Sequence, residues 1–183
     1  MPGFLISTFG FFLLILSDYL QGKGFLWISR LFSALGYLAV GYLLFLMLSF
    51  RGDDLFRGSR LIGGILTLLF CVFLLYSVII EVNLLPRRYG LQPGEALMRG
   101  TYGICRHPGF WWFFLLMPSL YLLHGDRNLL LLSGYMTLLN FLLVFLEDRF
   151  LFPAIFSNYK EYRERVPFLF PRFRPRTPGG RKK

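Results

Sequence analysis

The chain has 183 residues, of which 55% are hydrophobic and 16% are charged, and its mean hydropathy is +0.55. Soluble domains carry about 25% charged residues, so this composition excludes an ordinary water-soluble domain and indicates an integral membrane protein. The formal net charge is +10, but no basic and aromatic nucleic-acid-binding motif accompanies it. We therefore expect membrane lipids, and not a nucleic acid, as the partner of the basic residues.

Apolar segments of near-spanning length predict an all-α membrane protein with about five transmembrane helices. A membrane-spanning helix needs about 20 mostly apolar residues. In chain order the segments are residues 4–17, 31–50, 61–80, 109–123 and 129–146. The first lacks a basic leading segment and a small-residue cleavage site, so we do not interpret it as a cleaved signal peptide.

We expect a single membrane domain with three parts. Residues 1–80 form a scaffold whose small residues, such as Gly36 and Gly63, permit close helix packing. Residues 81–171 are expected to hold the cofactor-binding and catalytic part, and residues 172–183 form a basic tail.

The basic residues are distributed asymmetrically over the loops. Sixteen of the 20 fall on the side of the C-terminal tail if five helices are crossed. The positive-inside rule then places the C-terminus in the cytoplasm. We expect a multi-pass protein of the cell inner membrane with a cytoplasmic active site.

The turn HGDRN between the last two apolar segments is so short that the two helices must form an antiparallel hairpin. This hairpin brings Arg106 and His107 to the same level as Glu147 and Asp148. Pro108 suits the first turn of a helix, which places His107 at the N-cap beside unpaired backbone N–H groups. The acidic pair is expected to end its helix and to need a compensating partner there, such as a cation or the hydroxyl groups of a ribose.

Residues 157–166 have an amphipathic helical pattern. Tyr159, Tyr162 and Val166 share one face. This pattern predicts a cytoplasmic helix that either rests on the membrane surface or covers a ligand.

The two cysteines, Cys71 and Cys105, have no spacing typical of a zinc site or a disulfide framework. We expect no metal.

The segment GTYGICRHPGF, beginning at Gly100, resembles the G-x-Y-x-x-x-R-H-P signature of the isoprenylcysteine carboxyl methyltransferase and phospholipid methyltransferase superfamily. The segment EDRFLFPAIFSNYKEYRERVPFLFP resembles its second block. Members of that superfamily are integral membrane enzymes that use S-adenosylmethionine. The resemblance implies methyl transfer to a lipophilic acceptor, such as a prenylcysteine-like carboxylate, a phospholipid amine or a small thiol.

The resemblance also implies site residues. The cofactor-binding residues would be Tyr102, His107, Pro108, Glu147, Asp148, Tyr159 and Tyr162. Catalytic roles would fall to Arg106 and Arg165, which would hold a carboxylate of the cofactor or the acceptor, and to Glu147. The chain departs from the family pattern at Asp148, Phe156 and Phe168, which puts full activity and the acceptor in question.

Two other functions are compatible with the sequence. Membrane sterol and steroid reductases have a similar C-terminal block and use NADPH, whose 2′-phosphate Arg87 and Arg88 could bind. The departures from the family pattern also allow a non-catalytic, lipid-binding relative.

Overall fold

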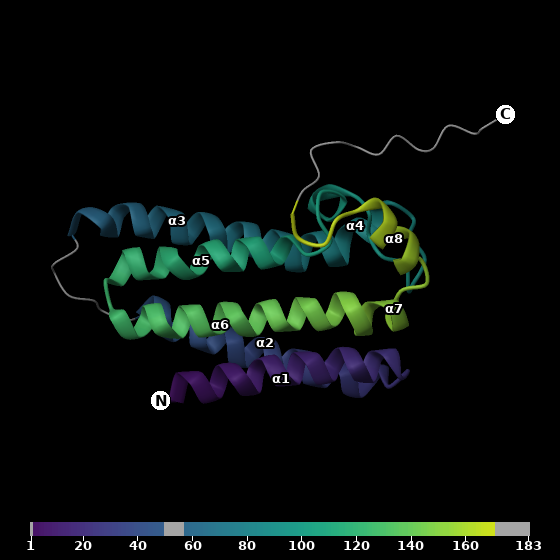
Figure 1. Ribbon diagram of the computed structural model, residues 1–183, viewed down its shortest axis with the longest axis horizontal. Helices are drawn as coiled ribbons and strands as arrows, with labels where there is room; N and C mark the ends of the chain where they lie inside the picture. The colour runs from purple at the N-terminus through teal and green to yellow at the C-terminus, as the bar shows by residue number, and fades with distance from the viewer. Residues whose placement is uncertain (1, 50–56, 171–183) are drawn as a thin grey trace.

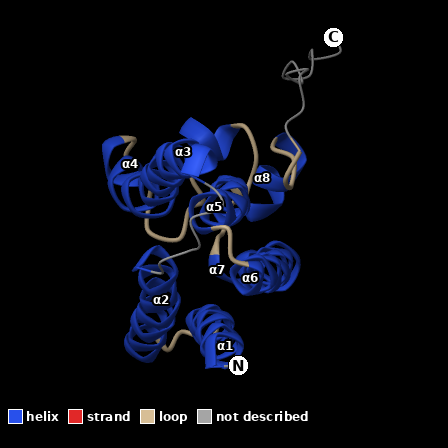
Figure 2. Cartoon of the chain, turned by 90° about the vertical axis from the view of Figure 1, so that its left-hand side faces the viewer, coloured by secondary structure: helices blue, strands red, loops and turns tan. Residues whose placement is uncertain are grey.

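The computed structural model of the protein describes residues 2–49 and 57–170. All the regular secondary structure in these residues is helical, and they contain no strand (Figure 1). The long helices run side by side with nearly parallel axes (Figures 1 and 2). The α-helices are α1 (Pro2–Gly22), α2 (Leu26–Ser49), α3 (Arg57–Leu75), α4 (Val82–Arg88), α5 (Pro108–His124), α6 (Arg127–Leu146), α7 (Phe152–Ile155) and α8 (Tyr159–Arg165). Three short turns of other helix types are η2 (Tyr76–Glu81), η3 (Gly100–Gly103) and η4 (Glu147–Leu151). The predicted basic tail lies outside the described residues.

Four helical stretches are long and apolar enough to cross a membrane. They are Pro2–Gly22, Leu26–Ser49, Ser59–Arg88 and Arg127–Ile155. Large apolar side chains cover their outer faces, with Trp27 82% and Leu68 69% exposed, and such faces suit contact with lipid. The protein therefore has the helices of a multi-pass membrane protein. The fourth predicted span is α5, which has 17 residues and is not one of these four.

Two predicted helix ends are wrong. The helix expected to stop at residue 80 continues through the π-helical turn η2 and α4 to Arg88, and the helix expected to stop at residue 146 continues through the π-helical turn η4 to Ile155. Hydropathy marks where a helix stops being apolar, whereas backbone hydrogen bonding decides where it ends. Each π-helical turn carries a buried carboxylate, Glu81 in η2 and Asp148 in η4. Such turns inside long helices are frequently found at functional sites.

The predicted hairpin is confirmed between α5 and α6. Gly125 ends α5 in the left-handed conformation with φ +72°, which glycine adopts without steric cost. Asp126 then caps α6, because its side chain accepts hydrogen bonds from the backbone N–H groups of Asn128 and Leu129 at 2.7 and 3.0 Å. α5 also packs closely on α3, where a Cβ at Gly63 would overlap the backbone of Leu123. The close helix packing expected at this glycine is confirmed.

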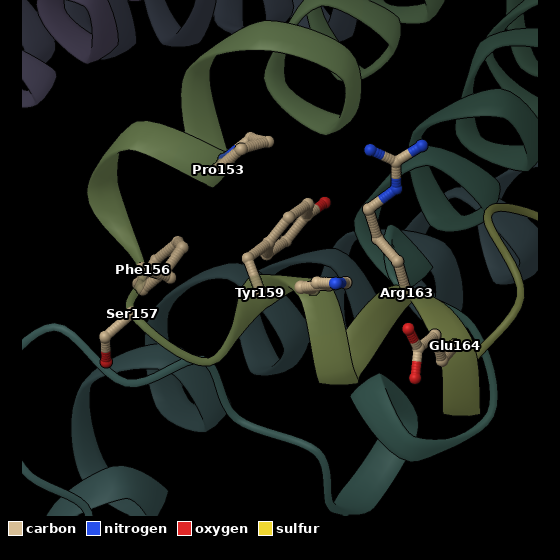
Figure 3. Close-up of a pocket in the computed structure, with 7 residues that line it drawn as sticks. Pro153, Phe156, Ser157, Tyr159, Arg163 and Glu164 are labelled. Carbon is tan, nitrogen blue, oxygen red and sulfur yellow. The ribbon is translucent and has the colours of Figure 1, made fainter.

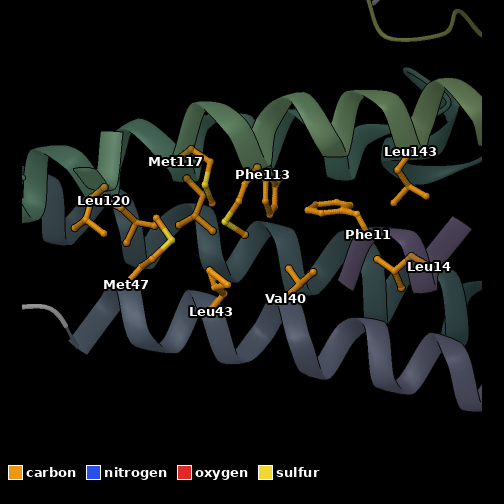
Figure 4. Packing of buried hydrophobic residues seen from close by; sticks show 12 residues of the cluster. Phe11, Leu14, Val40, Leu43, Met47, Phe113, Met117, Leu120 and Leu143 are labelled. Carbon is orange, nitrogen blue, oxygen red and sulfur yellow. The ribbon is translucent and has the colours of Figure 1, made fainter. Parts of the chain in front are cut away.

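The main hydrophobic core joins α1, α2, α5 and α6 along the length of the bundle (Figure 4). Its least exposed members are Leu116, Met117, Leu120 and Met136, each at most 1% exposed. Burial of a side chain of this size contributes about 1.5–3 kcal/mol. This core holds the scaffold pair α1–α2 against the hairpin α5–α6.

α8 lies on the protein at one end of the bundle, where it contacts α7 (Figure 1). Its aromatic face is buried by Ala96 and Val166, so that Tyr159 and Tyr162 are only 1% and 3% exposed. The amphipathic helix predicted for residues 157–166 is thus confirmed over Tyr159–Arg165. Its apolar face packs against protein, which excludes a helix whose tyrosines rest on lipid.

Candidate functional site

A buried ion pair joins the start of α5 to η4. The guanidinium of Arg106 donates from Nε to Asp148 Oδ1 at 2.6 Å and from Nη2 to Asp148 Oδ2 at 3.1 Å. Both residues are 7% exposed. Arg106 Nη1 also donates to the backbone carbonyl oxygens of Arg163 and Val166, at 3.1 and 2.8 Å. Arg106 therefore connects α5, η4 and the C-terminal end of α8.

His107 occupies the N-cap position of α5, directly before Pro108, as predicted. Its Nδ1 lies 3.4 Å from Glu147 Oε2 and its Nε2 lies 3.6 Å from Asp148 Oδ1. Nε2 is buried and has no hydrogen-bond partner within the described part of the chain. The ring is stacked on Phe152, with centroids 5.6 Å apart, and meets the ring of Phe168 edge-on at 5.3 Å.

The pKa of His107 is raised above its ordinary value of 6.5. Burial by itself would lower this pKa, but the interaction of the ring with the nearby carboxylates of Asp148 and Glu147 outweighs burial. The protonated imidazolium is thus the favoured partner of the acidic pair. The compensation expected for the acidic pair is supplied by this chain, from Arg106 and His107.

Two of the three predicted tyrosines donate hydrogen bonds from α8, and the third accepts one of these bonds through its backbone. The hydroxyl of Tyr159 donates to Asp148 Oδ1 at 2.7 Å, and the hydroxyl of Tyr162 donates to the backbone carbonyl oxygen of Tyr102 at 2.8 Å. Burial, as the largest cause, raises the pKa of each tyrosine, so all three remain neutral hydrogen-bond donors. Through them α8 is fixed to both sequence motifs.

More carboxyl groups than cations gather at this end of the bundle. Glu147 is hydrogen-bonded to the carboxyl group of Asp18 in α1, and Glu81 is completely buried. Within the described residues, the contacts of Asp18, Glu81, Glu147 and Asp148 include one arginine and one histidine. An excess of buried negative charge is costly unless a cation compensates it. Because a hydrogen bond between two carboxyl groups requires a proton on one of them, the proton shared by Asp18 and Glu147, together with Arg106 and His107, compensates the charge of Asp18, Glu147 and Asp148.

A pocket of about 450 Å³ opens between α7 and α8 (Figure 3). Its volume lies in the range of about 300–1,000 Å³ typical of small-molecule sites. The apolar part of its wall comes from Pro153, Phe156 and Tyr159, and the polar part from Ser157, Lys160, Arg163 and Glu164. Tyr159 thus belongs both to the pocket wall and to the network around Asp148. Side chains of both charges beside aromatic rings suit a zwitterionic ligand that carries an aromatic base.

The structure brings together all but one of the predicted site residues. The residues that meet are Tyr102, Arg106, His107, Pro108, Glu147, Asp148, Tyr159 and Tyr162. Arg165 is elsewhere: its side chain is 68% exposed and pairs with Glu161 at 2.5 Å, one turn back on α8. In residues 2–49 and 57–170, no group of three His, Cys, Asp or Glu side chains is arranged to hold a metal ion.

The sequence reasoning missed Asp18 and Glu81. Each is a lone carboxyl group at the end of an apolar segment. That position could have identified them, because an acidic side chain at the edge of a membrane is energetically unfavourable without a partner. It also missed Lys160, Arg163 and Glu164 as pocket residues and treated them as the polar face of α8. The helical pattern predicts that these three residues share one face of α8. It does not predict that α7 lies opposite that face and forms the other wall of the pocket.

Comparisons with protein-family models, with characterised proteins and with solved structures found no match for this chain.

Proposed function

We propose that the protein is an S-adenosylmethionine-dependent methyltransferase that acts on a lipophilic acceptor at the cytoplasmic face of the inner membrane. The observation that carries this proposal is the convergence of the two sequence blocks that resemble the methyltransferase superfamily. Arg106 and His107 of the first block contact Asp148 and Glu147 of the second, which lie about 40 residues further along the chain. The α5–α6 hairpin brings the two blocks to the same level, and the two-point ion pair of Arg106 with Asp148 adds a specific contact that the hairpin alone does not require.

The chemistry of the donor set fits this cofactor. S-adenosylmethionine supplies an activated methyl group on a positively charged sulfur, and the site carries an excess of carboxyl groups. Glu147 is the best candidate to face the positive charge, because Asp148 is engaged by Arg106 and Tyr159. Aromatic rings of Phe156 and Tyr159 in the pocket between α7 and α8 suit an adenine base, and Arg163 and Glu164 suit the amino-acid end.

Two tasks remain for the protein in such a transfer. The residues around the pocket must align donor and acceptor, which is worth about 7–11 kcal/mol in well-oriented systems, and they must exclude water. A thiolate or carboxylate acceptor needs no base. An amine acceptor must lose a proton, and Glu147 would be the candidate base, because Asp148 is held as a carboxylate by Arg106 and Tyr159.

Calorimetry on the purified protein in detergent tests the proposal. We expect S-adenosylmethionine and S-adenosylhomocysteine to bind and NADPH not to bind. Tight binding of NADPH alone would instead favour the reductase, and binding of none of the three would favour a non-catalytic relative.

Charge at the sulfur provides a sharper test. S-adenosylmethionine is positively charged there, whereas S-adenosylhomocysteine is neutral. Glu147→Gln should therefore weaken binding of the methyl donor by about 1–3 kcal/mol, the range for a charged hydrogen-bond partner, and weaken the product less. Glu161→Gln on the outer face of α8 is the matched control and should change neither. Equal losses for both ligands would show that Glu147 does not face the sulfur.

A further inference from the structure

Glu81 has no place in the proposed reaction, yet it is among the most buried side chains of the protein. It is the last residue of η2 and is 0% exposed. Its carboxylate accepts a hydrogen bond from the backbone N–H of Thr101 at 2.9 Å and a second, short one from the hydroxyl of the same threonine. A buried carboxylate is expensive even when it is bonded, so a residue that only filled space would be apolar.

The contact between Glu81 and Thr101 depends on the glycine at position 100. Its φ is +64°, in the left-handed region, and a Cβ there would overlap Glu81 Oε1. The chain can approach the carboxylate this closely only because position 100 has no side chain. Glu81 and Gly100 thus fit each other, although 19 positions separate them in the sequence.

The turn that starts at Thr101 leads directly to the site. The carbonyl oxygen of Thr101 accepts hydrogen bonds from the backbone N–H groups of Ile104 and Cys105, at 3.1 and 3.3 Å. Cys105 is followed by Arg106 and His107. The position of Thr101 therefore sets where the backbone of these two residues enters the site.

The same turn also holds α8. The carbonyl oxygen of Tyr102 accepts the hydrogen bond from Tyr162, so a shift of the turn would release α8 as well as His107. Glu81 is thus anchored on the helix of α3 and η2 and is bonded to a turn that contacts both halves of the site.

From these contacts we infer that Glu81 is a positioning residue of the methyl-transfer site, a role that rests on the proposed function. Its carboxylate holds the Gly100–Thr101 turn against the membrane helix and thereby places His107 for the ligand. Glu81 touches neither the pocket between α7 and α8 nor His107, so it acts through the turn and not by direct contact.

Substitutions at Glu81 test the inference by calorimetry with S-adenosylhomocysteine, at temperatures well below the unfolding midpoint of each variant. Glu81→Ala should weaken binding about tenfold, and Glu81→Gln, which keeps an oxygen for the N–H of Thr101, should retain most of the affinity. Glu95→Gln makes the same chemical change in the same connection, at an exposed carboxylate that accepts from the backbone N–H of Gln92, and should bind as the unaltered protein does. Unchanged affinity in Glu81→Ala would overturn the inference.

A combined variant separates positioning from general weakening. If Glu81 acts by placing His107, the double variant Glu81→Ala/His107→Ala should bind no more weakly than His107→Ala alone. Losses that multiply would mean that Glu81 acts independently of His107, which would also overturn the inference.

Hydrogen exchange measured without ligand tests the role of Glu81 even if the methyltransferase proposal is wrong. Backbone amides of residues 100–107 should exchange faster in Glu81→Ala than in Glu81→Gln, with little change in α1 and α6. If the unaltered protein does not bind S-adenosylhomocysteine, the methyltransferase proposal fails, while faster exchange still shows that Glu81 orders the turn. Equal exchange in the two variants would refute the positioning role in either case.

Discussion

Arg106 and Asp148, which are 42 positions apart in the sequence, form a two-point ion pair with N–O distances of 2.6 and 3.1 Å. The pair joins the segment before α5 to η4. The pair is buried, and the same guanidinium also binds two carbonyl oxygens at the end of α8. Arg106 thus has a structural task that the sequence did not reveal, because its donors are directed at the protein. These contacts use four of its five N–H donors, so one N–H of Nη2 remains for a ligand carboxylate.

Arg106→Ala should lower the free energy of unfolding by about 3–5 kcal/mol, because the variant leaves Asp148 buried without its arginine. Unfolding in detergent micelles, followed by circular dichroism, measures this change. Arg165→Ala is the matched control: it removes an exposed pair with Glu161 and should cost about 0–1 kcal/mol. Similar losses in the two variants would contradict the importance of the buried pair.

Tyr159→Phe should lower the free energy of unfolding by about 1.5–3 kcal/mol, because it removes the hydroxyl that donates to the Asp148 carboxylate. Tyr135→Phe provides a control, since its hydroxyl bonds only to the exposed hydroxyl of Thr8. Thermal unfolding of both variants should show a clear shift for Tyr159 and almost none for Tyr135. The reverse order would place the hydroxyl of Tyr159 outside the network.

Stability should depend on pH through His107. Its pKa is raised in the folded protein above the ordinary 6.5, so the folded state holds this proton more tightly than the unfolded state does. The resulting stabilisation is fully present below pH 6.5 and is lost as the pH rises through the higher folded value. The unfolding midpoint should therefore fall as the pH is raised from 6.5 upward through the folded-state pKa of His107.

His107→Gln should flatten this part of the pH profile, because glutamine does not titrate. A slope that persists unchanged in the variant would assign the pH dependence to another group.

The orientation predicted from the basic residues can be tested at two positions, Arg127 at the start of α6 and Lys160 in α8, beyond the other end of that long helix. Lys160 and Arg127 are both exposed in the structure. In a background with Cys71 and Cys105 replaced by serine, a cysteine at position 127 should react with an impermeant thiol reagent added to intact cells. A cysteine at position 160 should react only after the cells are opened. Labelling of position 160 from outside would reverse the orientation and move the proposed site away from the cytoplasm.

Several features of the fold were predictable from the sequence because they depend on local chemistry. Long apolar segments must form helices in lipid, since no water is available for their backbone groups. The α5–α6 hairpin followed from a turn too short for any other arrangement, and it correctly predicted that His107 faces Glu147. The tyrosine spacing on α8 likewise predicted one buried face.

The tertiary structure alone decided where the two long helices end and which groups fill the site. Helices containing Glu81 and Asp148 continue past the apolar segments, because π-helical turns keep the backbone bonded while the side chains turn toward partners from distant segments. Asp18 meets Glu147 only because α1 packs beside η4. Sequence determines which side chains are able to bond, but the direction of each side chain depends on the packing of the whole bundle. For that reason the sequence by itself determined a helical membrane protein with an arginine and a histidine opposite two carboxylates. Only the folded structure showed that Arg106 binds groups of the protein and that Glu81 is buried against Thr101.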